Sequence, residues 1–584
     1  MHCKKLFIVF VFGGSLLFGQ ERKTAEDDQL NMQQVEVTKS YTPSVSEVVK
    51  LRTAAPSLDS LTIAPKRVQY NFLSIPVLST FVPNKATPLQ LERPMAQPQY
   101  NSQFKMLLGN NKQMQLDASA NLALDRQQYL GIDLVWDQKG NLPNTTLNSE
   151  QTQFLINFNH DYYTNRLHAV NQIRFEGTRN QYYGVYDQQN LLDIFSSEGL
   201  DPLVKRGYFD AVSHWEWYDN PVQKLKLNLS LTTDNFSSSE QLLSVETTFR
   251  LSLRSSFIDF TPQLEVVQTD FIRDYFTDEA ISTQQIFLGT GLQYIQLNRD
   301  FKYKIGAKAF WVPKPWEPDG VQLFYYPDIL LSYNSKKSVV QPYLTVSGGL
   351  HGNSYTSLSL QNPFIAPSAN LRPQEERYKV ALGLNTQFNL GIDFGLEGFY
   401  ANSAGVPLFR RLAYSNSTPR VPYAFANAYE VIFDTQTRYG AKLSMQYEMD
   451  ESNQIGFNIQ HNTYEQTTAL RPWNLPQLEF ELNGNFSFLR RFLLMAKVHY
   501  WGNREVAYRP IFLNQPPELN TPEVRSMSGL TAINMTLNYQ TKTPWIFFVK
   551  GDLNLGSAPQ YWLNYPLFPS LVAAGFHYNF NFSM

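Results

Sequence analysis

Paired carboxylates and histidines are the residues of this sequence that could take part in acid–base chemistry. Glu375 lies next to Glu376, and Glu479 lies two residues before Glu481, so each pair could supply an acid and a base. The eight histidines are scattered and form no His-x-x-x-His pair, and neither a Gly-x-Ser-x-Gly element nor a phosphate-binding loop is present. We therefore expect no enzymatic activity, no cofactor and no metal site. The carboxylate pairs are interpreted as a solvated loop and part of a polar wall.

Cysteine content and net charge exclude further classes of function. The only cysteine, Cys3, lies close to the N-terminus, so the rest of the chain has no thiolate for a metal site or a disulfide. The formal net charge is −2, which gives no basic footprint for nucleic acid. We expect no nucleic-acid partner.

The N-terminus has the pattern of a secretory signal peptide. Lys4 and Lys5 precede an apolar run from Leu6 to Leu17, and Gly19 follows shortly before Gln20. The run is shorter than the roughly 20 residues that a membrane-spanning helix needs. Residues 1–19 are predicted to be a cleaved signal peptide, with the mature chain starting near Gln20.

Apolar and polar residues alternate strictly from about residue 101 onward. Leucine occupies every second position from Leu225 to Leu231, and the segments 301–311 and 478–488 alternate in the same way. These segments run for about 10 residues, enough for a tilted strand to cross a bilayer, whereas strands of soluble proteins average about 5 or 6. Aromatic residues make up 14% of the chain, which suits the aromatic girdles of a membrane barrel.

The C-terminal segment is aromatic at every second position and polar between. This pattern is typical of the strand that closes an outer-membrane β-barrel, with lipid on one face and a polar interior on the other. The aromatic residues are Phe576, Tyr578, Phe580 and Phe582.

Short turns, such as those predicted at 163–166 and 489–491, alternate with long polar connections, such as 179–206, as they do in bacterial barrels. Counting the segments between them predicts an all-β protein, a transmembrane antiparallel barrel of about 22 strands over residues 101–584. Its partners would be outer-membrane lipid and, during biogenesis, the barrel-assembly machinery. A lumen of this width needs a plug or another occluder.

Two segments with several prolines have a specific order of residues. Residues 362–367 read Asn-Pro-Phe-Ile-Ala-Pro, and residues 370–375 read Asn-Leu-Arg-Pro-Gln-Glu, followed by the predicted hairpin 378–400. This is similar to the "NPxLxP…L.PE" loop and hairpin in the barrels of TonB-dependent receptors, especially those of Bacteroidetes. Residues 564–569 are similar to that family's "YP.PGR" element, although Phe568-Pro569-Ser570 replaces Pro-Gly-Arg. The resemblance implies a role in transport across the outer membrane.

The resemblance ends before residue 101, because residues 20–100 are too few for the family's globular plug and carry none of its Gly-rich motifs. Prolines recur through this segment, which predicts an extended periplasmic or lumen-occluding chain. One short stretch resembles a TonB box, a strand that pairs with the edge of a partner's sheet. It consists of Val35, Glu36, Val37 and Thr38.

Charged residues at the polar positions of the predicted strands are expected to face the lumen. They could tune the passage of a polar solute, or satisfy one another and the N-terminal segment. The cations of one arc are Lys226, Lys302, Lys304 and Lys308, and the anions of a later arc are Asp393, Glu397, Glu479 and Glu481.

Aromatic residues in three connections, 180–186, 311–316 and 471–473, indicate either a surface for a protein partner or the aromatic girdle.

The function that fits best is transport with a reduced plug. Two alternatives stay open. One is a scaffold subunit of an outer-membrane assembly or secretion complex, and the other is a passive porin, whose loops would have to leave the mouth open.

Overall fold

The computed structural model describes residues 100–582, with gaps at 144, 186–188, 299, 315–319, 336–337, 389–390, 417–418, 451, 470 and 512–520. The predicted signal peptide lies outside the described residues, as does the N-terminal segment up to residue 99. So does the stretch that resembles a TonB box, Val35, Glu36, Val37 and Thr38.

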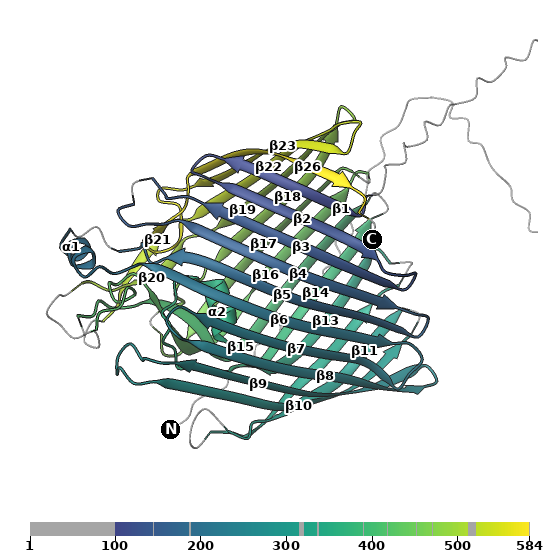
Figure 1. Cartoon of the computed structure of the whole chain (residues 1–584). Coiled ribbons are helices and arrows are strands. Elements are labelled where there is room, and N and C mark those ends of the chain that lie inside the picture. The colour runs from purple at the N-terminus through teal and green to yellow at the C-terminus, as the bar shows by residue number, and fades with distance from the viewer. Residues whose placement is uncertain are drawn as a thin grey trace, which may run out of the picture. The chain divides into compact units, whose positions relative to one another are not determined.

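A single antiparallel sheet of 22 strands closes on itself as a barrel (Figure 1). Closure is direct, because the first strand pairs with both the second and the last strand. The predicted fold class is therefore confirmed. The strands are β1 (Ser102–Gly109), β2 (Met114–Ala123), β3 (Gln128–Lys139), β4 (Gln151–Tyr163), β5 (Leu167–Gln181), β6 (Leu203–Trp217), β7 (Val222–Asp234), β8 (Ser239–Leu253), β9 (Ser256–Phe271), β10 (Ile281–Leu297), β11 (Phe301–Trp311), β12 (Leu323–Tyr333), β13 (Val340–His351), β14 (Gln374–Phe388), β15 (Ile392–Arg411), β16 (Tyr429–Glu448), β17 (Gln454–Gln466), β18 (Leu478–Phe488), β19 (Phe492–Trp501), β22 (Leu530–Gln540), β23 (Trp545–Leu555) and β26 (Ser570–Phe580).

The remaining elements lie in the long connections. They are the helices α1 (Gln189–Ser197) and α2 (Tyr355–Gln361), the ribbon of β20 (Arg504–Tyr508) with β21 (Glu523–Met527), and the small ribbon of β24 (Gln560–Trp562) with β25 (Tyr565–Pro566). Neither helix has the length and apolar character that crossing a membrane requires, as far as the chain is described.

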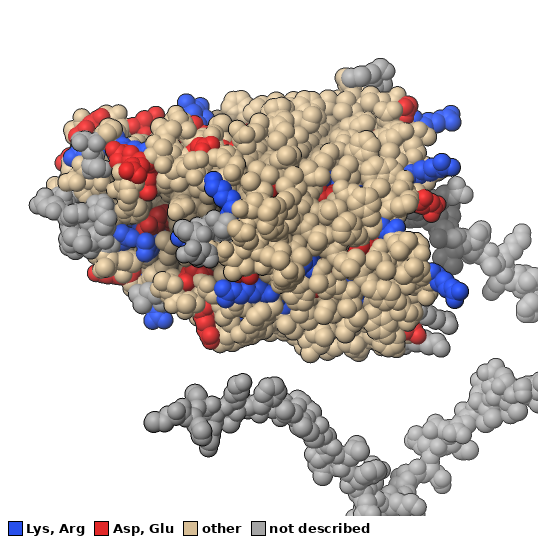
Figure 2. Space-filling model, turned by 90° about the horizontal axis from the view of Figure 1, so that it is seen from below, with Lys and Arg blue, Asp and Glu red and all other residues tan. Residues whose placement is uncertain are grey.

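The two faces of the sheet differ in polarity. One face carries cross-strand rows of apolar side chains such as Leu229, Leu243 and Val266, and many residues of this face are exposed. Exposed apolar side chains are stable in contact with lipid, so this is the outer face. Figure 2 shows the corresponding broad band with few charged residues, which instead gather towards the two ends of the barrel.

The C-terminal aromatic residues lie where the barrel closes. Phe576 stands between Phe547 and Met106, and Tyr578 between Trp545 and Phe104, on the same outer face. Phe580 ends β26 opposite Ser102. Phe582 lies just beyond the strand, and its backbone N–H donates to Asn101 Oδ1 at 2.7 Å. These contacts join the last strand of the barrel to the first.

The long connections all lie at one end of the barrel, and the turns at the other end are short (Figure 1). Between β18 and β19 the chain reverses through Leu489 and Arg490, both with positive φ, in the manner of a tight hairpin. Bacterial barrels have short periplasmic turns and longer external loops. The end with the long connections is therefore the external mouth.

We expect Leu229→Lys to destabilise the folded barrel by about 2–4 kcal/mol, because a charge would enter the hydrocarbon layer from the middle of β7. Asn228→Lys is the matched control, since the neighbouring side chain lies on the inner face, opposite Ser244. Denaturant titration of both variants in lipid vesicles measures the difference. Equal loss of stability in the two would contradict the assignment of the faces.

Candidate functional site

Four long connections fold together at the external mouth, and we call them the loop cap. They are the described parts of 182–202, 352–373, 412–428 and 556–569. Their apolar side chains form one buried cluster that includes Tyr182, Phe195, Tyr355, Phe364, Ile365, Leu412, Tyr423, Phe425, Tyr565 and Phe568.

The loop cap crosses the mouth rather than lining its rim. Tyr182 follows β5, and its hydroxyl donates to the carbonyl of Ile365 at 2.7 Å. Asn427, which precedes β16, donates from Nδ2 to the carbonyl of Tyr182 at 2.8 Å. Since β5 and β16 are 16 − 5 = 11 strands apart in a ring of 22, this contact joins opposite sides of the barrel.

Buried polar groups hold the loop cap together. Arg206 donates to the Tyr355 hydroxyl at 3.1 Å and to the carbonyls of Pro363 and Ile365 at 2.7 and 3.2 Å. The Tyr565 hydroxyl donates to the carbonyl of Asn427. Burial raises the pKa of the Tyr565 phenol far above its usual range, so it stays a protonated donor at neutral pH.

A buried carboxylate anchors α2 to the barrel wall. Glu240, at the start of β8, is 2% exposed. It accepts the backbone N–H groups of Tyr355 and Thr356, at 2.5 and 2.9 Å, and the hydroxyl of Thr356 at 2.7 Å. A negative charge at a helix N-terminus satisfies otherwise free donors, so Glu240 fixes the position of α2.

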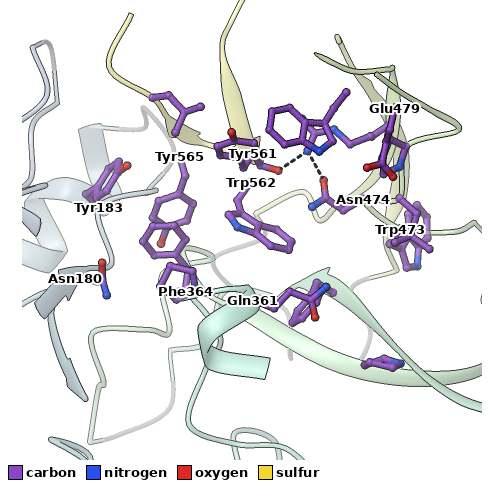
Figure 3. Close-up of a pocket in the computed structure, with 18 of the residues that line it drawn as sticks. Asn180, Tyr183, Gln361, Phe364, Trp473, Asn474, Glu479, Tyr561, Trp562 and Tyr565 are labelled. Atoms are coloured by element: carbon purple, nitrogen blue, oxygen red, sulfur yellow. Dashed lines mark hydrogen bonds between the residues drawn. The ribbon is translucent and has the colours of Figure 1, made fainter. Parts of the chain in front are cut away.

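A pocket of about 460 Å³ lies between the loop cap and the inner wall (Figure 3). This volume is in the range of small-molecule sites. Its aromatic lining comprises Tyr183, Phe364, Phe409, Trp473, Trp501, Tyr561, Trp562 and Tyr565. A second hollow of about 220 Å³ shares Gln151, Asn180 and Pro363 with it and continues along the inner wall beside α2.

The aromatic rings of the pocket support one another. Phe364 stacks on Tyr565 with 3.5 Å between ring centroids, and Tyr183 meets Tyr565 edge-on at 4.8 Å. Trp562, in the middle of the view in Figure 3, is only partly buried and meets the Phe409 ring at 5.1 Å. The pocket therefore offers a flat apolar surface to a ligand.

The polar groups of the pocket include one buried cation. Arg504 is 4% exposed and donates to the carbonyls of Gln560 and Tyr561 at 2.8 and 2.9 Å. Its Nε has no hydrogen-bond partner within the described chain. Burial lowers the pKa of Arg504 to about 10, so it remains charged at neutral pH.

The lysines expected to face the lumen lie on the face opposite the apolar rows, and most have a carboxylate nearby. Lys226 lies 3.4 Å from Glu246, while Lys304 and Lys308 lie 3.2 and 3.7 Å from Asp328. Lys302 stands opposite Ser332 near the periplasmic end.

The anions of the later arc have partners of their own. Glu397 accepts the Tyr343 hydroxyl at 2.6 Å, Glu481 lies 3.1 Å from Lys497, and Glu479 lies 4.0 Å from His499. Asp393 lines a polar hollow with Gln341, Asn385, Ser444 and Asn458. The structure thus brings neither arc to the other, and of the eight residues only Glu479 lines the aromatic pocket.

The aromatic residues of the connections have a role that the sequence did not indicate. Tyr182 is fully buried, and Tyr183 and Trp473 are 7% and 2% exposed, so these three do not form a free surface for a protein partner. Trp311 is exposed on the outer face, opposite Leu323. In the sequence, the group of aromatic residues from Tyr561 to Tyr565 is the feature that could have indicated the pocket.

Metal-ligating side chains do not gather in the part of the chain that the structure describes. No group of three or more His, Cys, Asp and Glu residues is placed to hold an ion there.

The sequence matches no protein-family model, and no curated protein matches it. The structure is similar to solved outer-membrane receptors and transporters at low sequence identity. The FrpB iron transporter from Neisseria meningitidis has 10% identity and a TM-score of 0.57, with 83% of this chain and 82% of that chain covered. The pyoverdine outer-membrane receptor FpvA from Pseudomonas aeruginosa has 11% identity and a TM-score of 0.58, with coverage of 84% and 80%.

The siderophore receptor PirA from Acinetobacter baumannii has 8% identity and a TM-score of 0.58, with coverage of 84% and 81%. At these identities the likeness establishes the fold. The chain folds as the 22-strand barrel of TonB-dependent receptors, and it is an integral outer-membrane protein.

Proposed function

We propose that the protein takes part in transport across the outer membrane as a gated barrel, with residues 20–100 acting in place of a full plug. The observation that carries the proposal is the aromatic pocket under the loop cap, which continues into a hollow on the inner wall. It offers a solute a place inside the barrel. The fold likeness to an iron transporter and to a pyoverdine receptor agrees with this role.

The loop cap argues against the passive porin. A porin needs an open mouth, whereas contacts such as that between Asn427 and Tyr182 join opposite sides of this one. A solute would pass only after the loop cap moves. Residues 20–100 would form a second barrier on the periplasmic side. TonB engagement through Val35, Glu36, Val37 and Thr38 stays a prediction, which a pull-down with the periplasmic domain of TonB tests.

Single-channel conductance in planar bilayers tests whether the loop cap and residues 20–100 are two barriers in series. The mature protein, a variant lacking residues 21–95, and a variant with 413–427 replaced by a short Gly-Ser linker are each expected to stay closed. The variant that combines both changes is expected to open large, stable channels. Large conductance from the intact protein would overturn the proposal in favour of a porin.

The second candidate function is a scaffold subunit, and the density of hydrogen bonds in the loop cap favours it. Arg206 alone makes three bonds to the segment 355–365. A silent doubly altered barrel, together with a stoichiometric partner that co-purifies in gentle detergent, would support the scaffold. A lone monomer would count against it.

A further inference from the structure

We propose that the pocket under the loop cap binds a solute with a carboxylate on an aromatic ring or on a sugar ring with an apolar face, and that Arg504 recognises the carboxylate. This inference rests on the proposed function, because it names the class of solute that the barrel would carry. Three observations lead to it, which are the missing counter-charge of Arg504, the aromatic lining, and the neutral amides around the pocket.

Arg504 is a buried cation with no carboxylate partner among the residues that the structure describes. Within that part of the chain its guanidinium donates only to uncharged groups, the carbonyls of Gln560 and Tyr561 and, at 3.4 Å, Oδ1 of Asn474. A buried charge is costly unless it is paired, so an anion in the pocket would offset this cost. Arginine presents its donors as a planar fork that matches the two oxygens of a carboxylate.

The other buried arginines of the described chain differ from Arg504 in their partners or in their position. Arg509 lies 2.8 Å from the carboxylate of Glu430. Arg206 uses its Nε and both terminal nitrogens on the loop cap. Arg411 donates from Nε to the carbonyl of Ala426 and from Nη2 to that of Gly184. Among the arginines that the structure describes, only Arg504 lines the pocket, and there it has a carboxylate partner for none of its nitrogens and no partner for its Nε.

The aromatic lining selects a flat ring. Trp562 is partly buried, and Trp501 and Tyr561 meet edge-on at 4.8 Å beside it. Aromatic faces bind flat rings by stacking and by dispersion. Figure 3 shows Trp562 between the Phe364–Tyr565 stack and the side of Asn474 and Glu479, so a ring that lies on it is close to both apolar and polar groups.

Neutral amides supply most of the other polar contacts. Gln151, Asn180, Gln361 and Asn474 line the pocket, and each side-chain amide both donates and accepts. Among the described residues of the lining Glu479 is the only acidic one, and it lies 4.0 Å from His499. The site therefore suits an anionic ring with neutral polar substituents better than a cation or a bare hydrocarbon.

Matched ligand pairs test the inference on the full-length protein in detergent. The probes are benzoate with benzamide and glucuronate with glucose, titrated by calorimetry and by the change in tryptophan fluorescence, to which Trp473, Trp501 and Trp562 of the pocket contribute. We expect the acid of at least one pair to bind about 10- to 100-fold more tightly than its neutral partner, since a hydrogen bond to a charged group contributes about 1.5–3 kcal/mol. The preferred pair tells an aromatic acid from a sugar acid.

Arg504→Gln should abolish the preference for the acid, and Arg504→Lys should retain part of it. Arg525→Gln is the control, because Arg525 stacks on Tyr508 in the ribbon of β20 and β21 and does not line the pocket. Trp562→Leu should weaken the binding of the acid and of its neutral partner by the same factor. The comparison within the unaltered protein needs no variant, so it stands even where Arg504→Gln fails to fold.

Equal affinity for acid and neutral partner in both pairs would overturn the inference. So would inorganic phosphate displacing the acids at equal concentration, because the ring would then contribute nothing. Binding with the expected preference but a silent doubly altered barrel would leave the pocket assigned and sink the transport proposal. Open channels from the doubly altered barrel, without a preference for the acid, would support the transport proposal and overturn the assignment of the pocket.

Discussion

Truncation of the chain after Pro569 is expected to abolish the assembled barrel altogether. The change removes β26, which pairs along its length with β23 on one side and β1 on the other. Both neighbours would be left with bare edges in the bilayer, where each unsatisfied backbone group costs several kcal/mol. The heat-modifiable mobility of the folded barrel on a denaturing gel should disappear, and the protein should be absent from the outer-membrane fraction.

The control for this truncation is a chain that ends after Phe582, which keeps β26 and the bonds between Phe582 and Asn101. It should assemble like the full chain. A protease-resistant barrel from the chain that ends at Pro569 would contradict the prediction, because it would mean that β1 and β23 can close directly.

Tyr565→Ala is expected to loosen the loop cap while the barrel stays intact. The ring of Tyr565 is 2% exposed, stacks on Phe364 and packs against Tyr183, and its hydroxyl donates to Asn427. Removal of a large buried aromatic side chain costs about 3–5 kcal/mol. Backbone amides of the loop cap should therefore exchange with deuterium about 100-fold faster or more, while exchange in the strands is unchanged.

Tyr565→Phe separates packing from hydrogen bonding at the same position. It keeps the stack on Phe364 and loses one bond, so we expect a cost of about 0.5–1.5 kcal/mol and a correspondingly smaller change in exchange. If Tyr565→Ala left the amides of 352–373 and 412–428 as protected as before, the loop cap would not depend on this side chain.

The strands could be predicted because their pattern is local. Alternation such as that of Leu225 to Leu231 repeats every two residues, and a bilayer permits little else than a closed barrel for such a chain. The short turns at 163–166 and 489–491 are also local, and both join strands as expected. The boundaries of long connections were less accurate. Arg206 was expected in one, yet it lies inside β6.

The loop cap could not be predicted, because it depends on contacts between distant parts of the sequence. The Tyr183 hydroxyl bonds to the carbonyl of Pro566, 383 residues away. No local pattern encodes that pairing. The helix α2 depends in a similar way on Glu240, which lies in the distant strand β8. The seven residues of α2 are also too few for a helical repeat to be recognised in the sequence.

The charge pairs of the inner wall are an intermediate case. The sequence placed Lys226 and Lys304 on a polar face, but their partners depend on register. Lys226 stands directly opposite Glu246, and Lys304 reaches Asp328 on the neighbouring strand β12. Opposite charges on adjacent strands stabilise the pairing. The charged positions could therefore be predicted from the sequence, but the partner of each charge could not.

The contacts across the mouth also impose an order on biogenesis. Tyr183 and Pro566 can meet only when strands near both ends of the chain are in place. Such distant contacts form late, because closing the long loop between them costs entropy before the contact stabilises the structure. The barrel must therefore close before the loop cap can form. A newly inserted molecule would pass through a stage in which the barrel is closed on itself but its external mouth is not yet sealed.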